Sequence, residues 1–193
     1  MFKKRTLLGI AGILAASLTL SACSTSDPDT GSGSPDSSSE SAATFNDQDV
    51  MFAQSMIVHH SQAIDMAETI LAKDGIDPRV TDLAENIKGA QGPEIDQLEG
   101  YLEGWGATSE MGGMDSMGGM MSEDDMADLE AATGVEASRL FLEQMTEHHM
   151  GAVEMAQMEA DQGKDPDATA LAQKIIGDQT SELALMEELL ASL

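Results

Sequence analysis

The sequence has 193 residues and a formal net charge of -26, from 35 acidic and 9 basic side chains. This length accommodates one ordinary domain with an additional tail. The acidic balance supplies no basic patch for phosphates, which argues against a nucleic-acid partner, and the single cysteine excludes an internal disulfide framework.

Residues 1–22 have the pattern of a lipoprotein export signal. Three basic residues precede an apolar run from Leu7 to Leu20, which is too short for a comfortable membrane-spanning helix. The Leu-Ser-Ala-Cys sequence that ends at Cys23 resembles the bacterial lipobox, in which the cysteine is lipidated. A plain signal peptide with an incidental cysteine is the alternative. The pattern predicts a lipid-anchored protein at the extracytoplasmic face of the cell membrane.

Residues 23–43 are rich in Ser, Asp, Gly and Pro. Such a segment cannot bury enough apolar surface to fold, because it carries few apolar side chains. We therefore expect a flexible tether that separates the lipid anchor from a folded domain over residues 44–193.

The folded part of the sequence is an internal duplication. Phe52–Ala67 and Phe141–Ala156 share the pattern F-x3-M-x2-H-H-x2-A-x-[DE]-M-A at an offset of 89. The segments that begin at Asp77 and Asp165 also match, at an offset of 88. A repeat this detailed predicts two equivalent helix-turn-helix units. We assign repeat one to 45–104, a Met-rich linker to 105–134 and repeat two to 135–193.

Four long helices are expected, over about 47–73, 78–103, 136–161 and 166–191. The Asp-Pro pairs at 77–78 and 165–166 can open the second helix of each repeat, because proline at the first helical position removes an N–H that has no partner there. Ser122 and Asp125 resemble a capping box for a short helix that ends near Ala132. Two amphipathic hairpins can bury their apolar faces together, which predicts an all-α four-helix bundle.

Histidine and methionine share one face of the first helix of each repeat. At about 100° per residue, Met56, His59, His60 and Met66 fall within roughly 120° of one another. The equivalent residues of the second repeat are Met145, His148, His149 and Met155. Imidazole is a common ligand of copper and zinc, and a thioether favours Cu(I). The pattern therefore predicts copper as the bound metal, and Cu(I) rather than Cu(II).

Two repeated acids, Glu94 and Glu182, are candidates for orienting these histidines through their second ring nitrogen. The alternative for the whole pattern is structural. A methionine at helical spacing usually fills a core, and a buried histidine is more often a hydrogen-bonded core residue than a ligand. The duplication of adjacent histidine pairs favours metal binding over this alternative.

The Met-rich linker contains a second group of thioethers in a Gly-rich segment that cannot pack as a core. Its methionines are candidates for weak metal capture: Met111, Met114, Met117, Met120 and Met121. Their spacing would let a flexible loop surround a Cu(I) ion with sulfur. A low-complexity linker without function is the alternative.

The doubled M-x2-H-H-x2-A-x2-M-A motif, each copy followed by D-P-x4-L-A-x2-I-x3-Q-x2-E, resembles the domain of unknown function 305 family. The resemblance covers about residues 45–193. It implies a ferritin-like four-helix fold, and some members of the family are periplasmic or secreted copper-binding proteins associated with copper resistance. The ligands implied by the motif are the eight His and Met residues of the two faces.

We expect a binding protein that sequesters or buffers copper without turnover. Two alternatives stay open: a metal-dependent oxidoreductase or hydrolase, and a metal-free helical interaction module of the cell envelope. No nucleophile–base pair or cofactor loop favours an enzyme. The sequence leaves open a homodimer, and with it whether the histidine faces meet inside one bundle or across two chains.

Overall fold

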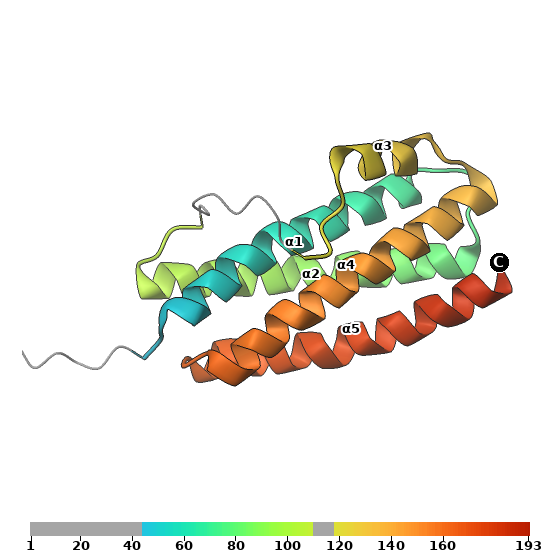
Figure 1. Ribbon diagram of the computed structural model, residues 1–193. Coiled ribbons are helices and arrows are strands. Elements are labelled where there is room, and N and C mark those ends of the chain that lie inside the picture. The colour runs from blue at the N-terminus through green and yellow to red at the C-terminus, as the bar shows by residue number, and fades with distance from the viewer. Residues whose placement is uncertain (1–43, 110–117) are drawn as a thin grey trace, which may run out of the picture. The chain divides into compact units, whose positions relative to one another are not determined.

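The computed structural model describes residues 44–109 and 118–193, and Figure 1 shows how their helices are arranged. The regular elements in these ranges are α1 (Asp47–Leu71), α2 (Pro78–Trp105), α3 (Glu123–Ala131), α4 (Gly134–Gln162) and α5 (Pro166–Ser192). Every one is a helix, which confirms the predicted all-α bundle with a short helix between its two hairpins. The export signal, Cys23 and the tether lie outside the described residues. Within the described ranges, we find no helix with the length and apolar character needed to span a membrane.

Side-chain caps open four of the five helices. Asp77 and Asp165 cap α2 and α5, each with a proline directly after it, as predicted. Ser122 and Asp125 form the predicted capping box at α3. At α1, Asn46 forms a capping box with Asp49 that the sequence reasoning missed. These caps satisfy backbone N–H groups that have no partner inside the helix.

The helices pair as the duplication predicts. The hairpin α1–α2 and the hairpin α4–α5 are joined mainly by contact between α1 and α4. In Figure 1, α3 lies at the end of the bundle where α1 ends and α4 begins. The first helices of the two repeats therefore cross at the centre of the molecule, and these are the helices that carry the His-His motifs.

The bundle has two apolar core clusters. The first core cluster contains Ala63 and Met66 of α1 and Leu142 and Met145 of α4. The second core cluster contains Phe52, Ala53, Met56 and Ile57 of α1 and Ala152 and Ala156 of α4. Along both helices, the His-His pairs fall between the residues of one cluster and those of the other. The four histidines form a polar layer between two apolar regions, which we call the histidine layer.

A buried carboxyl pair connects the start of α1 to the turn before α5. Asp49 accepts hydrogen bonds from the backbone N–H groups of Lys164, at 3.0 Å, and Asp165, at 2.8 Å. Burial and then the neighbouring Asp49 raise the pKa of the fully buried Glu159 to about 8. Asp49 behaves in the opposite way, because the backbone hydrogen bonds outweigh its burial and lower its pKa. Glu159 is therefore protonated and Asp49 ionised near neutral pH.

Candidate metal centre

The two His-His motifs meet inside one chain. His59 of α1 and His148 of α4 are both fully buried, and their ring centroids lie 3.7 Å apart with the planes tilted by 41°. This distance is shorter than the roughly 4.5–7 Å at which aromatic rings usually pair. The two motifs are therefore in direct ring contact at the centre of the bundle.

The other histidine of each pair is held by a glutamate from the second helix of its own repeat. His60 Nε2 lies 2.9 Å from Glu94 Oε2, and His149 Nε2 lies 2.6 Å from Glu182 Oε2. The sequence singled out both acids, and the structure places each beside a histidine. A neutral ring that donates its Nε2–H to a carboxylate keeps the lone pair on Nδ1, which is then free to bind a metal.

The two histidines in ring contact, His59 and His148, have lowered pKa values. Burial and the neighbouring His60 lower the pKa of His59 to about 3, and the nearby backbone of Gly118 only partly opposes this. Burial and the neighbouring His59 lower the pKa of His148 to about 2. Burial alone would raise the pKa of Glu94, but hydrogen bonds from His60 and Lys174 outweigh it and hold that pKa low. His59 and His148 are therefore neutral near pH 7, and neutral imidazole is the form of histidine that binds a metal.

Six buried ring nitrogens of the histidine layer have no hydrogen-bond partner among the described residues. They are both nitrogens of His59, both nitrogens of His148, and Nδ1 of His60 and of His149. Burying a polar group without a partner costs about 1–3 kcal/mol. So many unpartnered nitrogens in one layer destabilise the fold, and an ordered water or a bound ion would give them a partner.

The methionines flank the layer in a different grouping from the one that the sequence suggested. The sequence pattern treats the two methionines of one helix as a set. Because α1 and α4 run in opposite directions, Met66 and Met145 instead belong to the first core cluster. Met56 and the partly buried Met155 belong to the second core cluster. Of the four motif methionines, each side of the histidine layer thus receives one from each repeat, and the first core cluster also contains Met186.

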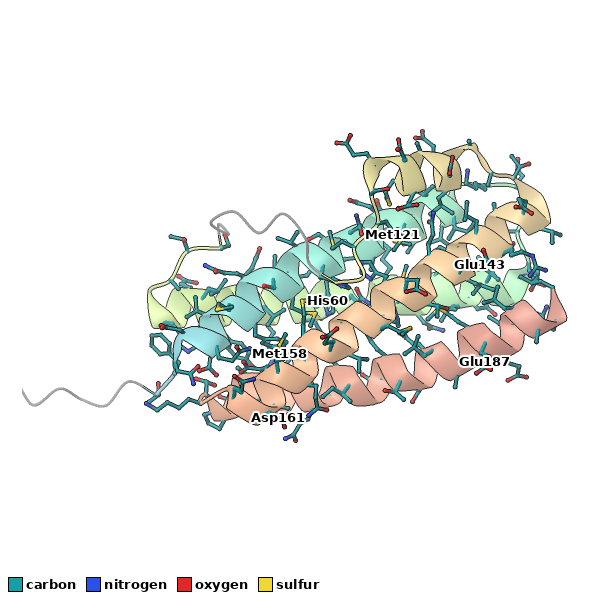
Figure 2. The ribbon with its side chains drawn as sticks, in the orientation of Figure 1. His60, Met121, Glu143, Met158, Asp161 and Glu187 are labelled. Carbon is teal, nitrogen blue, oxygen red and sulfur yellow. The ribbon has the colours of Figure 1, made fainter. Side chains whose placement is uncertain are left out.

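The end of the Met-rich linker lies against both motif helices. Gln62 donates from Nε2 to the carbonyl of Met121 at 2.9 Å, and its Oε1 accepts from the Met121 N–H at 2.7 Å. On α4, the bare Cα of Gly151 packs against the backbone of Gly118 and Gly119 so closely that a Cβ would overlap the Gly118 carbonyl. Figure 2 labels Met121 beside α1 and α3. Of the linker candidates, Met120 is also described and is half-buried, whereas Met111, Met114 and Met117 lie outside the described residues.

Two buried amides received no role from the sequence, although the repeat alignment matches them. Gln91 and Gln179 are repeat-matched, precede Glu94 and Glu182 by three positions and are almost fully buried with unpartnered amide atoms. Both occur in the Q-x2-E pattern that the two repeats share, and this pattern could have marked them as candidates. Among the described residues, no three His, Cys, Asp or Glu side chains are grouped as a ready metal site.

The family model "Domain of unknown function (DUF305)" matches residues 49–190, which include both motifs and both acid–histidine pairs. The chain belongs to the DUF305 family. None of the curated proteins matches it.

Solved DUF305 structures share this fold. A DUF305 protein from Streptomyces coelicolor that is thought to be secreted is 32% identical, with 75% of this chain and 91% of that chain covered and a TM-score of 0.71. A DUF305 fragment from Deinococcus radiodurans is 34% identical, with coverage of 77% and 98% and a TM-score of 0.71. CopM in its Cu(I)-bound form is 29% identical, with coverage of 75% and 96% and a TM-score of 0.62. CopM is also known in Ag-bound, Cu(II)-bound and apo forms.

Proposed function

We propose that this DUF305 protein binds copper at its histidine layer and sequesters or buffers the ion outside the cytoplasm. The observation that carries the proposal is the set of six unpartnered ring nitrogens, buried between two groups of thioethers. Copper is the cargo of such a protein, and release rather than turnover ends its cycle.

The donor set favours copper over other metals. Structural zinc sites in proteins usually draw on thiolates, and iron or magnesium sites draw on carboxylates. Thioether sulfur is soft and selects Cu(I), and neutral imidazole binds copper in either oxidation state. The likeness to CopM, which has been solved with Cu(I), Cu(II) and Ag, supports this choice. We propose Cu(I) as the preferred ion because a methionine from each repeat flanks either side of the layer.

We further propose that Cys23 carries the lipid anchor and that the protein works at the extracytoplasmic face of the membrane. The support is the sequence of residues 1–23, with its basic start, apolar run and Leu-Ser-Ala-Cys ending. Metabolic labelling with a fatty acid tests this directly, since Cys23→Ser should abolish both the label and the membrane association.

A competition titration against a chromogenic Cu(I) chelator tests copper binding. Replacement of all four histidines by Ala should abolish tight binding, because it removes every ring nitrogen of the layer. The matched control replaces Met150 and Met158, two exposed methionines of α4, by Leu. This control should bind Cu(I) as the wild type does. Unchanged affinity in the four-histidine variant would contradict the proposal.

The same samples separate a binding protein from an oxidoreductase and from a metal-free module. A buffer takes up a fixed amount of Cu(I) and consumes no oxygen beyond that event, whereas an oxidoreductase consumes oxygen continuously. Copper that binds only the native state raises the melting temperature by mass action. A melting temperature that copper leaves unchanged would favour the metal-free module.

A further inference from the structure

The two acid–histidine pairs are equivalent by repeat but differ in their surroundings. Glu94 Oε2 accepts from His60, while Glu94 Oε1 lies 2.9 Å from Lys174 Nζ on α5. Lys174 also pairs with Asp178 at 2.6 Å. Glu182 pairs with His149, and in the part of the chain that the structure describes it forms no salt bridge to a lysine or arginine. One carboxylate is thus shared with a cation and the other is not.

The difference originates in the sequence of the two repeats. The offset of 88 that relates Glu94 to Glu182 also relates Asn86 to Lys174 and Ala90 to Asp178. Asn86 is exposed on α2 and carries no charge. The first repeat therefore has no counterpart of Lys174 that could face Glu182. The two repeats have kept both glutamates but differ at the position of the lysine.

The cation acts on the metal-binding nitrogen through the carboxylate. A carboxylate that accepts a ring N–H raises the electron density at the other ring nitrogen and strengthens it as a ligand. The positive charge of Lys174 partly neutralises the Glu94 carboxylate. Glu94 therefore polarises the His60 ring less than Glu182 polarises the His149 ring. The Glu94 side chain is only 9% exposed and the Lys174 side chain is 55% exposed, so solvent screens this ion pair mainly from the lysine side. Among the described residues, no lysine or arginine pairs with Glu182 in the same way.

We propose that Lys174 is a positioning residue that makes the two halves of the copper centre unequal. The first half contains His59 and His60, and the second half contains His148 and His149. The second half is the tighter copper site and fills first, and the first half is weakened by Lys174. This inference rests on the proposed copper-binding function, and it assigns an order of filling to the same residues.

Half-site variants of the protein separate the two contributions. Replacing His148 and His149 by Ala leaves the first half, and replacing His59 and His60 by Ala leaves the second half. In a Cu(I) competition titration, the second half should bind about tenfold more tightly than the first, the low end of the effect of partners that orient metal ligands. Lys174→Asn should tighten the first half towards the affinity of the second and leave the second half unchanged. Asn86→Lys, its repeat-matched converse, should weaken the second half only.

Lys174→Arg distinguishes charge from packing. It keeps the cation beside Glu94 and should preserve the weaker affinity of the first half. Equal affinities of the two halves, or a first half that Lys174→Asn leaves unchanged, would overturn the inference.

Metal-free protein provides a readout that does not depend on copper. In 15N spectra, Lys174→Asn should shift the ring nitrogens of His60 and leave those of His149 in place, and Asn86→Lys should do the reverse. If neither half binds copper, the proposed function fails, and these spectra alone decide whether Lys174 acts on His60. Unshifted His60 nitrogens in Lys174→Asn would overturn the role of Lys174 whatever the copper result.

Discussion

The rings of His59 and His148 lie 3.7 Å apart at their centroids, although the two residues belong to different repeats of the chain. The contact exists because α1 and α4 cross at the centre of the bundle. It joins two copies of one motif into a single buried layer, in which each repeat supplies half of the nitrogen donors.

Removing a carboxylate partner should weaken copper binding without unfolding the bundle. Glu182→Gln keeps the shape of the side chain but removes the charge that polarises His149. We expect copper affinity to fall about 10–100-fold, the range seen when partners of metal-binding histidines are changed. Isothermal titration against a competing chelator measures this effect. Glu187→Gln, which changes an exposed acid on the same helix, should bind as the wild type does, and an equal loss in that control would rule out a local effect of Glu182.

The flanking thioethers should set the preference for Cu(I). Leucine has nearly the volume of methionine, so each Met→Leu substitution should cost less than about 1.5 kcal/mol of stability. The four positions to change are Met56, Met66, Met145 and Met155. The combined variant should lose Cu(I) affinity and keep most of its Cu(II) affinity, because imidazole alone serves Cu(II). Parallel titrations with both ions measure the preference, and an unchanged ratio of affinities would show that these methionines only fill the core.

A methyl group on Gly151 should displace the end of the Met-rich linker. The added Cβ would overlap the Gly118 carbonyl, whereas a Cβ on Gly177 of α5 would meet nothing within 4 Å. Gly177→Ala should therefore stabilise the protein by up to about 1 kcal/mol through helix propensity, and Gly151→Ala should be less stable than this control. The Met121 N–H, which donates to Gln62, should exchange its hydrogen faster in Gly151→Ala. Unchanged exchange would show that the linker tolerates the methyl group.

Stability should fall as pH rises from about 6.5 to 8, and Glu159 should be the cause. Its folded pKa of about 8 lies above the ordinary value of 4.5. Between these two pKa values, the folded state keeps a proton that the unfolded state has lost. The free energy of unfolding therefore decreases as pH rises, until the folded carboxyl also loses its proton near pH 8. Asp49 and Asp165 face the same carboxyl, and Asp49 stays ionised because its pKa is lowered. The slope should approach about 1.4 kcal/mol per pH unit.

Glu159→Gln isolates this contribution. Below pH 6.5, the lowered pKa values of His59 and His148 produce a slope of opposite sign, so the difference between the variant and the wild type is the informative quantity. Denaturant unfolding at several pH values measures it. The variant should gain stability relative to the wild type as pH rises to 8, and a difference independent of pH would contradict the assignment.

Much of the fold could be predicted from the duplication. Asp-Pro steps at 77 and 165 mark helix starts by local chemistry alone, and the His/Met faces follow from helical periodicity. The partners across helices could not be predicted in this way. The pairing of Met66 with Met145 in one cluster depends on the antiparallel crossing of α1 and α4. The ion pair of Lys174 with Glu94 joins the two repeats. The sequence does not reveal it, or the significance of Asn86 at the position that matches Lys174, until the second helices of the two repeats are placed side by side.

The Gln62 contact shows a second limit of sequence reasoning. Gln62 and Gly151 occupy equivalent positions of the two repeats. One holds the linker by side-chain hydrogen bonds and the other by having no side chain. A repeat alignment shows such positions as mismatches, because it records residue identity and not the shared segment that both contact.

X-ray absorption spectroscopy of the Cu(I)-loaded protein identifies the atoms bound to copper and therefore shows whether the histidine layer holds the ion. We predict a first shell that contains imidazole nitrogen together with thioether sulfur, and loss of the nitrogen contribution when the four histidines are replaced. A shell of sulfur alone, or a spectrum that the histidine replacements leave unchanged, would contradict a copper centre in the histidine layer.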